Sequence, residues 1–510
     1  MNNVIIVGSG IAGLATAARL VAKGYNVSIF ESASQTGGKI HSFDLDGYRF
    51  DAGPSLFTMP KLVDEIFNIL GENPRNYFNY NKKKIHCEYF WNDGKTLTAF
   101  DNKKKFLSEV ENKFGVSNTI MNKYLDRSKK KYEITEPIFL QKSLHKFSTY
   151  ISKDTLKALI SLRVFDINKS LNKTNEHFIK EPHLVQLYNR YATYNGSNPY
   201  ETSGIMTLIQ HLESHYGTWI PSGGMVQISR SITSLLKRKG VKIYLNSHVD
   251  KIIVKRNKAT GILSNGKEHT SDYIISNMDI FFTYEILLKN FKIPKRVSKA
   301  ERSSSAVIFY WGINKTFEQL DLHNILFSEN YKNEFECIFN KGELSDDPTI
   351  YINITSKDVP SDAPDGSENW FVMINAPYDS KQNWDEITSQ LKKNVIKKIN
   401  RILKVDIEKY IQVEKVYSPQ TIEKITHSYL GSLYGTSSNS KLSAFFRHPN
   451  FTNKIGNLFF LVWPDISNKI CIPFSLIKFI TFKSFLSSIL YQISKCLFSF
   501  SVRSSVSVEL

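Results

Sequence analysis

The stretch VIIVGSGIAGLATAARLVAKGYNVSIFE, residues 4–31, decides the fold of the N-terminal part of the chain. Residues 4–7 form a short continuous apolar run, which is typical of a buried parallel strand. Gly8, Gly10 and Gly13 follow in GxGxxG spacing, residues 11–23 have helical periodicity up to a C-capping Gly24, and residues 26–30 have the pattern of a second strand. This order predicts a Rossmann-like dinucleotide-binding unit.

The glycine loop and the first turn of the helix are the predicted phosphate site. The first glycine makes the tight turn, the second lets the backbone approach a pyrophosphate, and the third lets helix and strand pack closely. The helix N-terminus offers free N–H groups to the same anion. The predicted cofactor contacts in this segment are Gly8, Ser9, Gly10, Ile11, Ala12 and Gly13.

Glu31 completes the predicted site. It lies 21 residues after Gly10, at the end of the second strand, where a carboxylate can accept hydrogen bonds from ribose hydroxyls. Gly37, Gly38 and Lys39 follow, and this pair of glycines with a cation resembles the GG[RK] element of amine oxidase-like flavoproteins. The resemblance implies FAD as the cofactor, with Gly38 and Lys39 among its contacts. A simple turn is the alternative interpretation of the element.

Four further stretches resemble bacterial carotenoid desaturases of the phytoene desaturase family. They are DAGPSLFTMP (51–60), LVQLYNRYATYNGSNPY (184–200), GTWIPSGGMVQIS (217–229) and GSLYGTSSN (431–439). The resemblance covers about residues 3–462, and DAGPSLFTMP with the middle region favours the 1-hydroxycarotenoid 3,4-desaturase branch. It also implies that Val249 lies beside the adenine of FAD.

The expected fold is α/β, with a Rossmann-like FAD-binding domain built from separate segments and a second α+β substrate domain. The FAD-binding segments are 1–100, 221–285 and 426–462, the last of which supplies a closing strand. Residues 101–220 are a largely helical lid or substrate region, and residues 286–425 are the substrate domain, with strands expected over 306–313, 350–355 and 370–377. The aromatic residues of these strands either line an apolar tunnel or belong to an ordinary core.

Composition limits the partners and the compartment. The net charge of +18 is explained first by AT-rich codons and second by an anionic membrane surface, and no nucleic-acid-binding module accompanies it. Cys87, Cys337, Cys471 and Cys496 lie far apart, which predicts a reducing compartment without disulfides or a metal site. No secretory signal and no uncharged apolar run of about 18 residues stands out. We therefore expect a cytoplasmic protein, peripheral on the inner face of the membrane.

The expected reaction is desaturation of a C40-type polyene by hydride transfer to flavin, with oxygen or a quinone as the electron acceptor. Flavin supplies the redox chemistry, so no catalytic triad or metal set is required. Arg190, Tyr194 and Asn198, in NRYATYNGSNP (189–199), are candidates for polar groups near the flavin. Turn formation at Asn195-Gly196 and Asn198-Pro199 explains much of this motif without catalysis.

The C-terminal stretch GNLFFLVWPDISNKICIP, residues 456–473, departs from the family pattern after Val462. Family members continue with a glycine-rich turn against the flavin, whereas this chain has Trp463 and Pro464, and residues 463–510 contain neither glycine nor alanine. We interpret this tail as a shifted reading frame or an equivalent disruption near codon 463. Divergence is the alternative, since Ile472-Pro473 still aligns, and a membrane-lying tail is another.

Three functions follow as alternatives. The first is an FAD-dependent carotenoid desaturase of carotenoid biosynthesis. The second is an inactive, membrane-associated relative whose flavin site is disrupted by the altered tail. The third is another amine oxidase-like FAD oxidoreductase, acting on an amine or a protoporphyrinogen, which shares the GG[RK] element but not NRYATYNGSNP or GSLYGTSSN.

Overall fold

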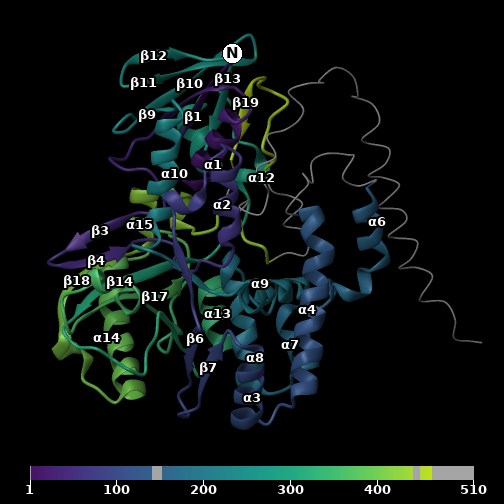
Figure 1. The fold of residues 1–510 in the computed structure, drawn as a ribbon, viewed down its shortest axis with the longest axis vertical. Coiled ribbons are helices and arrows are strands. Elements are labelled where there is room, and N and C mark those ends of the chain that lie inside the picture. The colour runs from purple at the N-terminus through teal and green to yellow at the C-terminus, as the bar shows by residue number, and fades with distance from the viewer. Residues whose placement is uncertain (1, 140–151, 440–447, 462–510) are drawn as a thin grey trace, which may run out of the picture. The chain divides into compact units, whose positions relative to one another are not determined.

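The computed structural model describes residues 2–139, 152–439 and 448–461 (Figure 1). The altered tail after Val462 lies outside them. Among the described residues, no helix has both the length and the hydropathy that crossing a bilayer requires.

A five-stranded parallel sheet is the frame of the N-terminal motif. Its order is β19-β13-β1-β2-β9, so that strands from three distant parts of the chain lie side by side. The strands are β1 (Asn3–Val7), β2 (Asn26–Phe30), β9 (Lys242–Tyr244), β13 (Tyr273–Ser276) and β19 (Leu458–Phe460). The predicted first and second strands are confirmed, and the chain enters the sheet again through β13 and β19.

Helices cover one face of this sheet and a small meander covers the other. Helix α1 (Ile11–Val21) packs against α10 (Val226–Arg238) and α2 (Pro60–Asn68). The meander of β10 (Val249–Lys255), β11 (Lys258–Ser264) and β12 (Lys267–Thr270) shares an apolar core with Ile5 and Val7 of β1. Helix α1 ends two residues before the predicted Lys23, because the amides of Lys23 and Gly24 turn back to the carbonyls of Leu20 and Val21.

The second large sheet has seven strands of mixed direction, in the order β18-β14-β17-β16-β15-β6-β7. Only the β15–β6 pair among these strands is parallel. The strands are β6 (Ile85–Phe90), β7 (Thr96–Phe100), β14 (Ser305–Ile313), β15 (His323–Leu326), β16 (Ile350–Ile354), β17 (Glu368–Ala376) and β18 (Ile411–Tyr417). The three strands expected in the substrate domain are β14, β16 and β17, so the predicted second sheet is confirmed.

The two faces of the seven-stranded sheet have different covers. Helix α14 (Trp384–Leu403) packs on one face and closes a core that contains Trp311 and Trp370. The other face meets the helical region 103–216, which contributes residues such as Leu184 and Tyr188. Helices of that region are α3 (Lys103–Phe114), α4 (Asn118–Phe139), α6 (Lys153–Ile160), α7 (Leu171–Phe178), α8 (Pro182–Asn189) and α9 (Ile209–Tyr216).

The remaining elements connect these layers. Two short antiparallel pairs are β3 (Ser42–Leu45) with β4 (Tyr48–Asp51) and β5 (Tyr80–Lys82) with β8 (Trp219–Pro221). The remaining α-helices are α11 (Ile280–Phe282), α12 (Lys295–Ser298), α13 (Tyr331–Glu336) and α15 (Pro419–Thr426). The arrangement leaves a cavity at the carboxyl ends of β1, β2 and β13.

Candidate cofactor site

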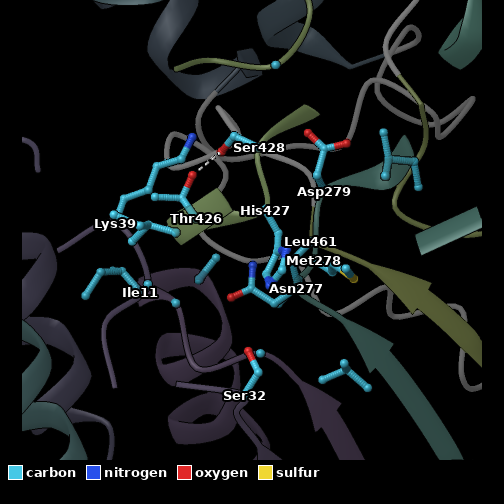
Figure 2. A pocket seen from close by; sticks show the side chains of 18 of the residues that line it. Ile11, Ser32, Lys39, Asn277, Met278, Asp279, Thr426, His427, Ser428 and Leu461 are labelled. Carbon is cyan, nitrogen blue, oxygen red and sulfur yellow. Dashed lines mark hydrogen bonds between the residues drawn. The ribbon is translucent and has the colours of Figure 1, made fainter. Parts of the chain in front are cut away.

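A cavity of about 600 Å³ begins at the glycine loop after β1. Eight of the predicted cofactor contacts line it: Gly8, Gly10, Ile11, Ala12, Glu31, Gly38, Lys39 and Val249. Residues after β13 and between α15 and Ser437 also line it, as Figure 2 shows for Asn277, Met278 and Thr426. The two predicted contacts outside the lining, Ser9 and Gly13, fix the shape of the loop instead.

Close backbone packing explains the spacing of the glycines. A Cβ added at Gly13 would lie 2.4 Å from the carbonyl oxygen of Gly8 and 2.8 Å from Oδ1 of Asn277. The Gly13 amide donates to that same Oδ1 at 2.9 Å. The loop is therefore held against the strand by an asparagine side chain, and any larger residue at position 13 would displace it.

Glu31 is held in place by the loop that it follows. Its carboxylate accepts hydrogen bonds from the amide and the hydroxyl of Ser9, both at 2.7 Å, and from the amide of Ala33 at 2.9 Å. The side chain is 8% exposed. A fixed carboxylate at the end of β2 matches what a ribose diol requires.

The paired glycines of the GG[RK] element pack directly on the first loop. The Gly37 amide donates to the carbonyl of Ser9 at 3.0 Å, and a Cβ at Gly38 would lie 3.2 Å from the Cα of Gly10. Gly37 has φ of +121°, a conformation that favours glycine. The element is thus a second backbone layer of the same cradle.

Lys39 brings a cation into the cavity. Its Nζ donates to the carbonyl of Leu433 at 2.7 Å, and burial lowers its pKa to about 8, against the opposing charge of Asp279. Figure 2 shows both side chains at the cavity wall. His427 also lines the cavity. Burial lowers the pKa of His427, and the charge of His248 lowers it further, so the imidazole is neutral at pH 7.

Several lining residues were not predicted from the sequence, and Asn277 is the most informative of them. Val7 pairs with Ser276 in the parallel register of β1 and β13, which puts Asn277 beside Gly8. A polar residue directly after an apolar strand, as in YIISN (273–277), is the pattern that marks it. Its partner strand, 264 residues away from Gly13, could not be assigned without the fold.

The three candidate catalytic residues do not line this cavity. Arg190 is buried, and its guanidinium donates to the hydroxyls of Tyr194 and Tyr89, both at 2.8 Å. The Tyr194 hydroxyl donates to Glu213 at 2.6 Å. Asn198 instead fixes a turn: its amide donates to Asn439 at 2.8 Å and its side chain accepts from Tyr200.

The sequence motifs that carry the family resemblance are joined to one another by hydrogen bonds. Asp51 of DAGPSLFTMP caps α10 by accepting from the amide of Met225, at 2.7 Å, in the IPSGGM stretch. The Ser438 amide of GSLYGTSSN donates to the Ser197 hydroxyl of NGSNP at 3.1 Å. These hydrogen bonds join segments that are distant in the sequence around the cavity. Many polar residues of the motifs therefore stabilise the fold.

Comparison with known proteins identifies the family. A model of the family described as flavin containing amine oxidoreductase matches residues 11–460. The chain belongs to this family. The flavin in that description confirms the prediction of FAD as the cofactor. The family match ends two residues before Val462, after which the expected pattern is lost.

Individual relatives narrow the resemblance. A 1-hydroxycarotenoid 3,4-desaturase from Flavobacterium sp. (strain P99-3) is 52% identical over 459 residues, covering 90% of this chain and 94% of the relative. A 4,4'-diapolycopene oxygenase from Methylomonas sp is 30% identical over 465 residues, covering 90% and 93%. The predicted resemblance to carotenoid desaturases, and to that branch, is confirmed.

Solved structures support the fold. An oxidoreductase from Methanosarcina mazei superposes with a TM-score of 0.59 at 15% identity, over 90% of this chain and 94% of that one. Cyclohexylamine oxidase from Brevibacterium oxydans gives 0.55 at 14% identity, over 90% and 93%. The predicted α/β flavoprotein fold with its second sheet is confirmed.

Proposed function

We propose that this chain is an FAD-dependent carotenoid desaturase that introduces the 3,4 double bond of a 1-hydroxycarotenoid. The 52% identity over 90% of the chain to a desaturase of that name carries the proposal. The glycine cradle and Glu31 fit FAD, because they combine close backbone approach with a fixed carboxylate at the end of β2.

The chain's own residues position the reactants. The amides at the start of α1 would bind the pyrophosphate, Glu31 the ribose and Val249 the adenine side of the cavity, with Gly38 and Lys39 near the phosphates. Bound FAD would supply the oxidant: its isoalloxazine ring can accept a hydride, and with it two electrons, from one carbon, and a proton leaves the adjacent carbon to complete the double bond. The apolar face of the seven-stranded sheet excludes water from the polyene. An acceptor such as oxygen or a quinone must then remove the electrons.

The visible spectrum of the purified 510-residue chain tests cofactor binding. Stoichiometric flavin that dithionite bleaches would support a working site and justify liposome assays with a 1-hydroxycarotenoid. In those assays one additional conjugated double bond should shift the carotenoid absorption to longer wavelength. A chain that stays colourless with added FAD would favour the inactive relative, and reducible FAD without product would reject the proposed substrate.

We also propose peripheral binding to the inner face of the membrane, through α6. Leu156 and Ile160 are 60% and 80% exposed, and their spacing of four residues puts them on the same helix face. Lys153 and Lys157 flank them, which suits anionic lipid head groups. A water-insoluble polyene must be taken from a bilayer, so a docking face is required by the substrate.

Co-sedimentation with anionic and with neutral lipid vesicles tests this surface. Replacing both Leu156 and Ile160 by Ser should reduce binding to anionic vesicles, because the apolar contact is lost. Tyr244→Ser is the matched control, since Tyr244 is 40% exposed on β9 and belongs to the five-stranded sheet. Equal binding by all three proteins would reject α6 as the docking face.

A further inference from the structure

The face of the seven-stranded sheet opposite α14 has a polar centre. His323 and Asn353 are paired in the antiparallel register of β15 and β16, so both side chains lie on the same face. Tyr351, two residues before Asn353, lies on that face as well, and it packs against the apolar cluster formed with the helical region. The alternate residues Ile350, Ile352 and Ile354 instead belong to the core under α14.

His323 presents an unmatched hydrogen-bond donor at this centre. Its Nδ1 lies 2.7 Å from the Tyr351 hydroxyl and 3.3 Å from the Asn353 Nδ2, which can only donate. Burial lowers the pKa of His323 to about 4, so the ring is neutral and its hydrogen is on Nε2. Nε2 is buried and has no partner among the described residues.

Arg190 contributes a second unmatched donor. Its Nε is buried without a partner in the described part of the chain, whereas its other nitrogens contact Tyr89 and Tyr194. Tyr89, whose hydroxyl accepts from Arg190, is in register with Ile325, and Ile325 lies two residues from His323 on the same face of β15. A buried N–H without an acceptor costs about 1–3 kcal/mol, so both donors favour an oxygen acceptor between these elements.

The charge balance selects the kind of oxygen. Glu213 lies 3.6 Å from the Arg190 guanidinium and is itself buried, so the cluster already contains a carboxylate for its cation. A second carboxylate or a phosphate would add an uncompensated buried charge. A neutral hydroxyl, which accepts through its oxygen and donates to the carboxylate or a tyrosine oxygen, fits the cluster better.

A hydrogen-bonded connection joins this centre to the cofactor cavity. The Tyr351 hydroxyl also lies 2.7 Å from Ser55 Oγ, and the preceding residue, Pro54, lines the cavity. In a 1-hydroxycarotenoid only carbon 2 separates the hydroxyl-bearing carbon from carbon 3, where the double bond forms. The hydroxyl must therefore be held close to the oxidant, on the side where the sheet meets the cavity.

We infer that His323, with Arg190 beside it, binds the terminal hydroxyl of the carotenoid and so sets which bond faces the cofactor. This inference rests on the proposed function, because it assumes a hydroxylated polyene as the substrate. His323 is a specificity-determining residue here, and the hydroxyl is a neutral ligand oxygen that accepts from the imidazole Nε2–H.

The test compares binding of an acyclic 1-hydroxycarotenoid with that of the matching carotenoid that has hydrogen at carbon 1. Both are presented in detergent micelles to the full chain, and quenching of tryptophan fluorescence gives the two dissociation constants. His323→Asn retains a group near Nδ1 and lacks the outer donor, whereas the longer His323→Gln carries an amide N–H near Nε2. We expect His323→Asn to reduce the preference for the hydroxylated ligand about tenfold and His323→Gln to restore most of it.

His211→Phe is the matched control, because His211 is a buried imidazole on α9 that stacks on His215, with ring centroids 4.6 Å apart, and neither of its nitrogens is a buried atom without a partner in the described part of the chain. The preference of this variant for the hydroxylated ligand should equal that of the unaltered chain. An unchanged preference in His323→Asn, or an equal fall in His211→Phe, would overturn the inference while leaving desaturation intact. An unaltered chain that binds both ligands equally would do the same, whereas one that binds neither would reject the proposed function itself.

Discussion

The five-stranded sheet and the seven-stranded sheet are packed in different ways. After β1 and β2 backbone packs against backbone, and side chains larger than hydrogen are excluded at Gly13 and Gly37. On the seven-stranded sheet large side chains fill the interior, with the buried Phe371 and Tyr310 among them. A charged, flexible cofactor is held by amide dipoles at short range, whereas a polyene without polar groups along its length needs shaped apolar contact.

Removal of a large side chain should damage the second sheet most. Trp370 is fully buried between β17 and α14 and donates to Glu368 at 2.7 Å. Trp370→Ala leaves a cavity and should lower the free energy of unfolding by about 3–5 kcal/mol, measured by urea titration. Trp219→Ala, at a half-buried tryptophan of β8, should cost clearly less. Equal losses would show that burial against α14 adds nothing to the stability that Trp370 provides.

Addition of a side chain should damage the first sheet. Gly13→Val forces atoms into the carbonyl of Gly8 and the side chain of Asn277, at a cost of about 1–3 kcal/mol or more. We expect most bound flavin to be lost on gel filtration, measured by absorbance. Gly94→Ala tests backbone strain alone, since φ is +86° and no atom lies within 4 Å. Full flavin content in Gly13→Val would contradict the close-packing explanation.

Removal of a single charge should weaken the cofactor site without unfolding it. Glu31→Gln keeps the shape of the side chain but loses the charged acceptor facing Ser9 and the ribose. The dissociation constant for FAD, from flavin fluorescence of the apoprotein, should rise about ten- to hundredfold. Glu72→Gln, which removes a carboxylate paired with Lys239 at 2.7 Å outside the cavity, should leave it unchanged.

The smallest expected effect is a pH dependence of cofactor affinity. Burial lowers the pKa of Lys39 to about 8, so the ammonium is lost as pH rises through that value. The anionic pyrophosphate favours the protonated form, so FAD should bind more tightly below pH 8 than above it. A rise of about one pKa unit on binding corresponds to about tenfold in affinity. Lys39→Arg should remove this pH dependence of the affinity for FAD. The same pH dependence in that variant would exclude Lys39 as its source.

The sequence predicted the parts of the fold that depend on neighbours along the chain. The first βαβ unit, from β1 to β2, follows from glycine spacing, helical periodicity and the acid at its end, because the pairing of β1 with β2 and the contact between Ser9 and Glu31 lie within about 30 residues. Strands β14, β16 and β17 were found within two residues of their predicted bounds. Their periodicity reflects burial on one or both faces, which a single sequence records.

Contacts between distant segments could not be predicted in the same way. Asp51 caps α10, 174 residues further along, and Asn277 supports a loop 264 residues before it. The candidates Arg190 and Tyr194 were chosen for the flavin, yet they lie in a buried cluster with Glu213, away from the lining of the described cavity. Residue type and spacing give no information on which of several pockets a side chain enters.

The sequence by itself determined the nucleotide-binding loop, the acid that follows β2 and the family, because glycine and carboxylate requirements are local and chemically narrow. Only the tertiary structure decided that β13 and β19 complete the sheet and that Asn277 supports the loop. It also decided that the buried Nε2 of His323 and Nε of Arg190 have no partner among the described residues. The physical reason is that parallel strands and covering helices bring together residues whose separation along the chain carries no record of their contact.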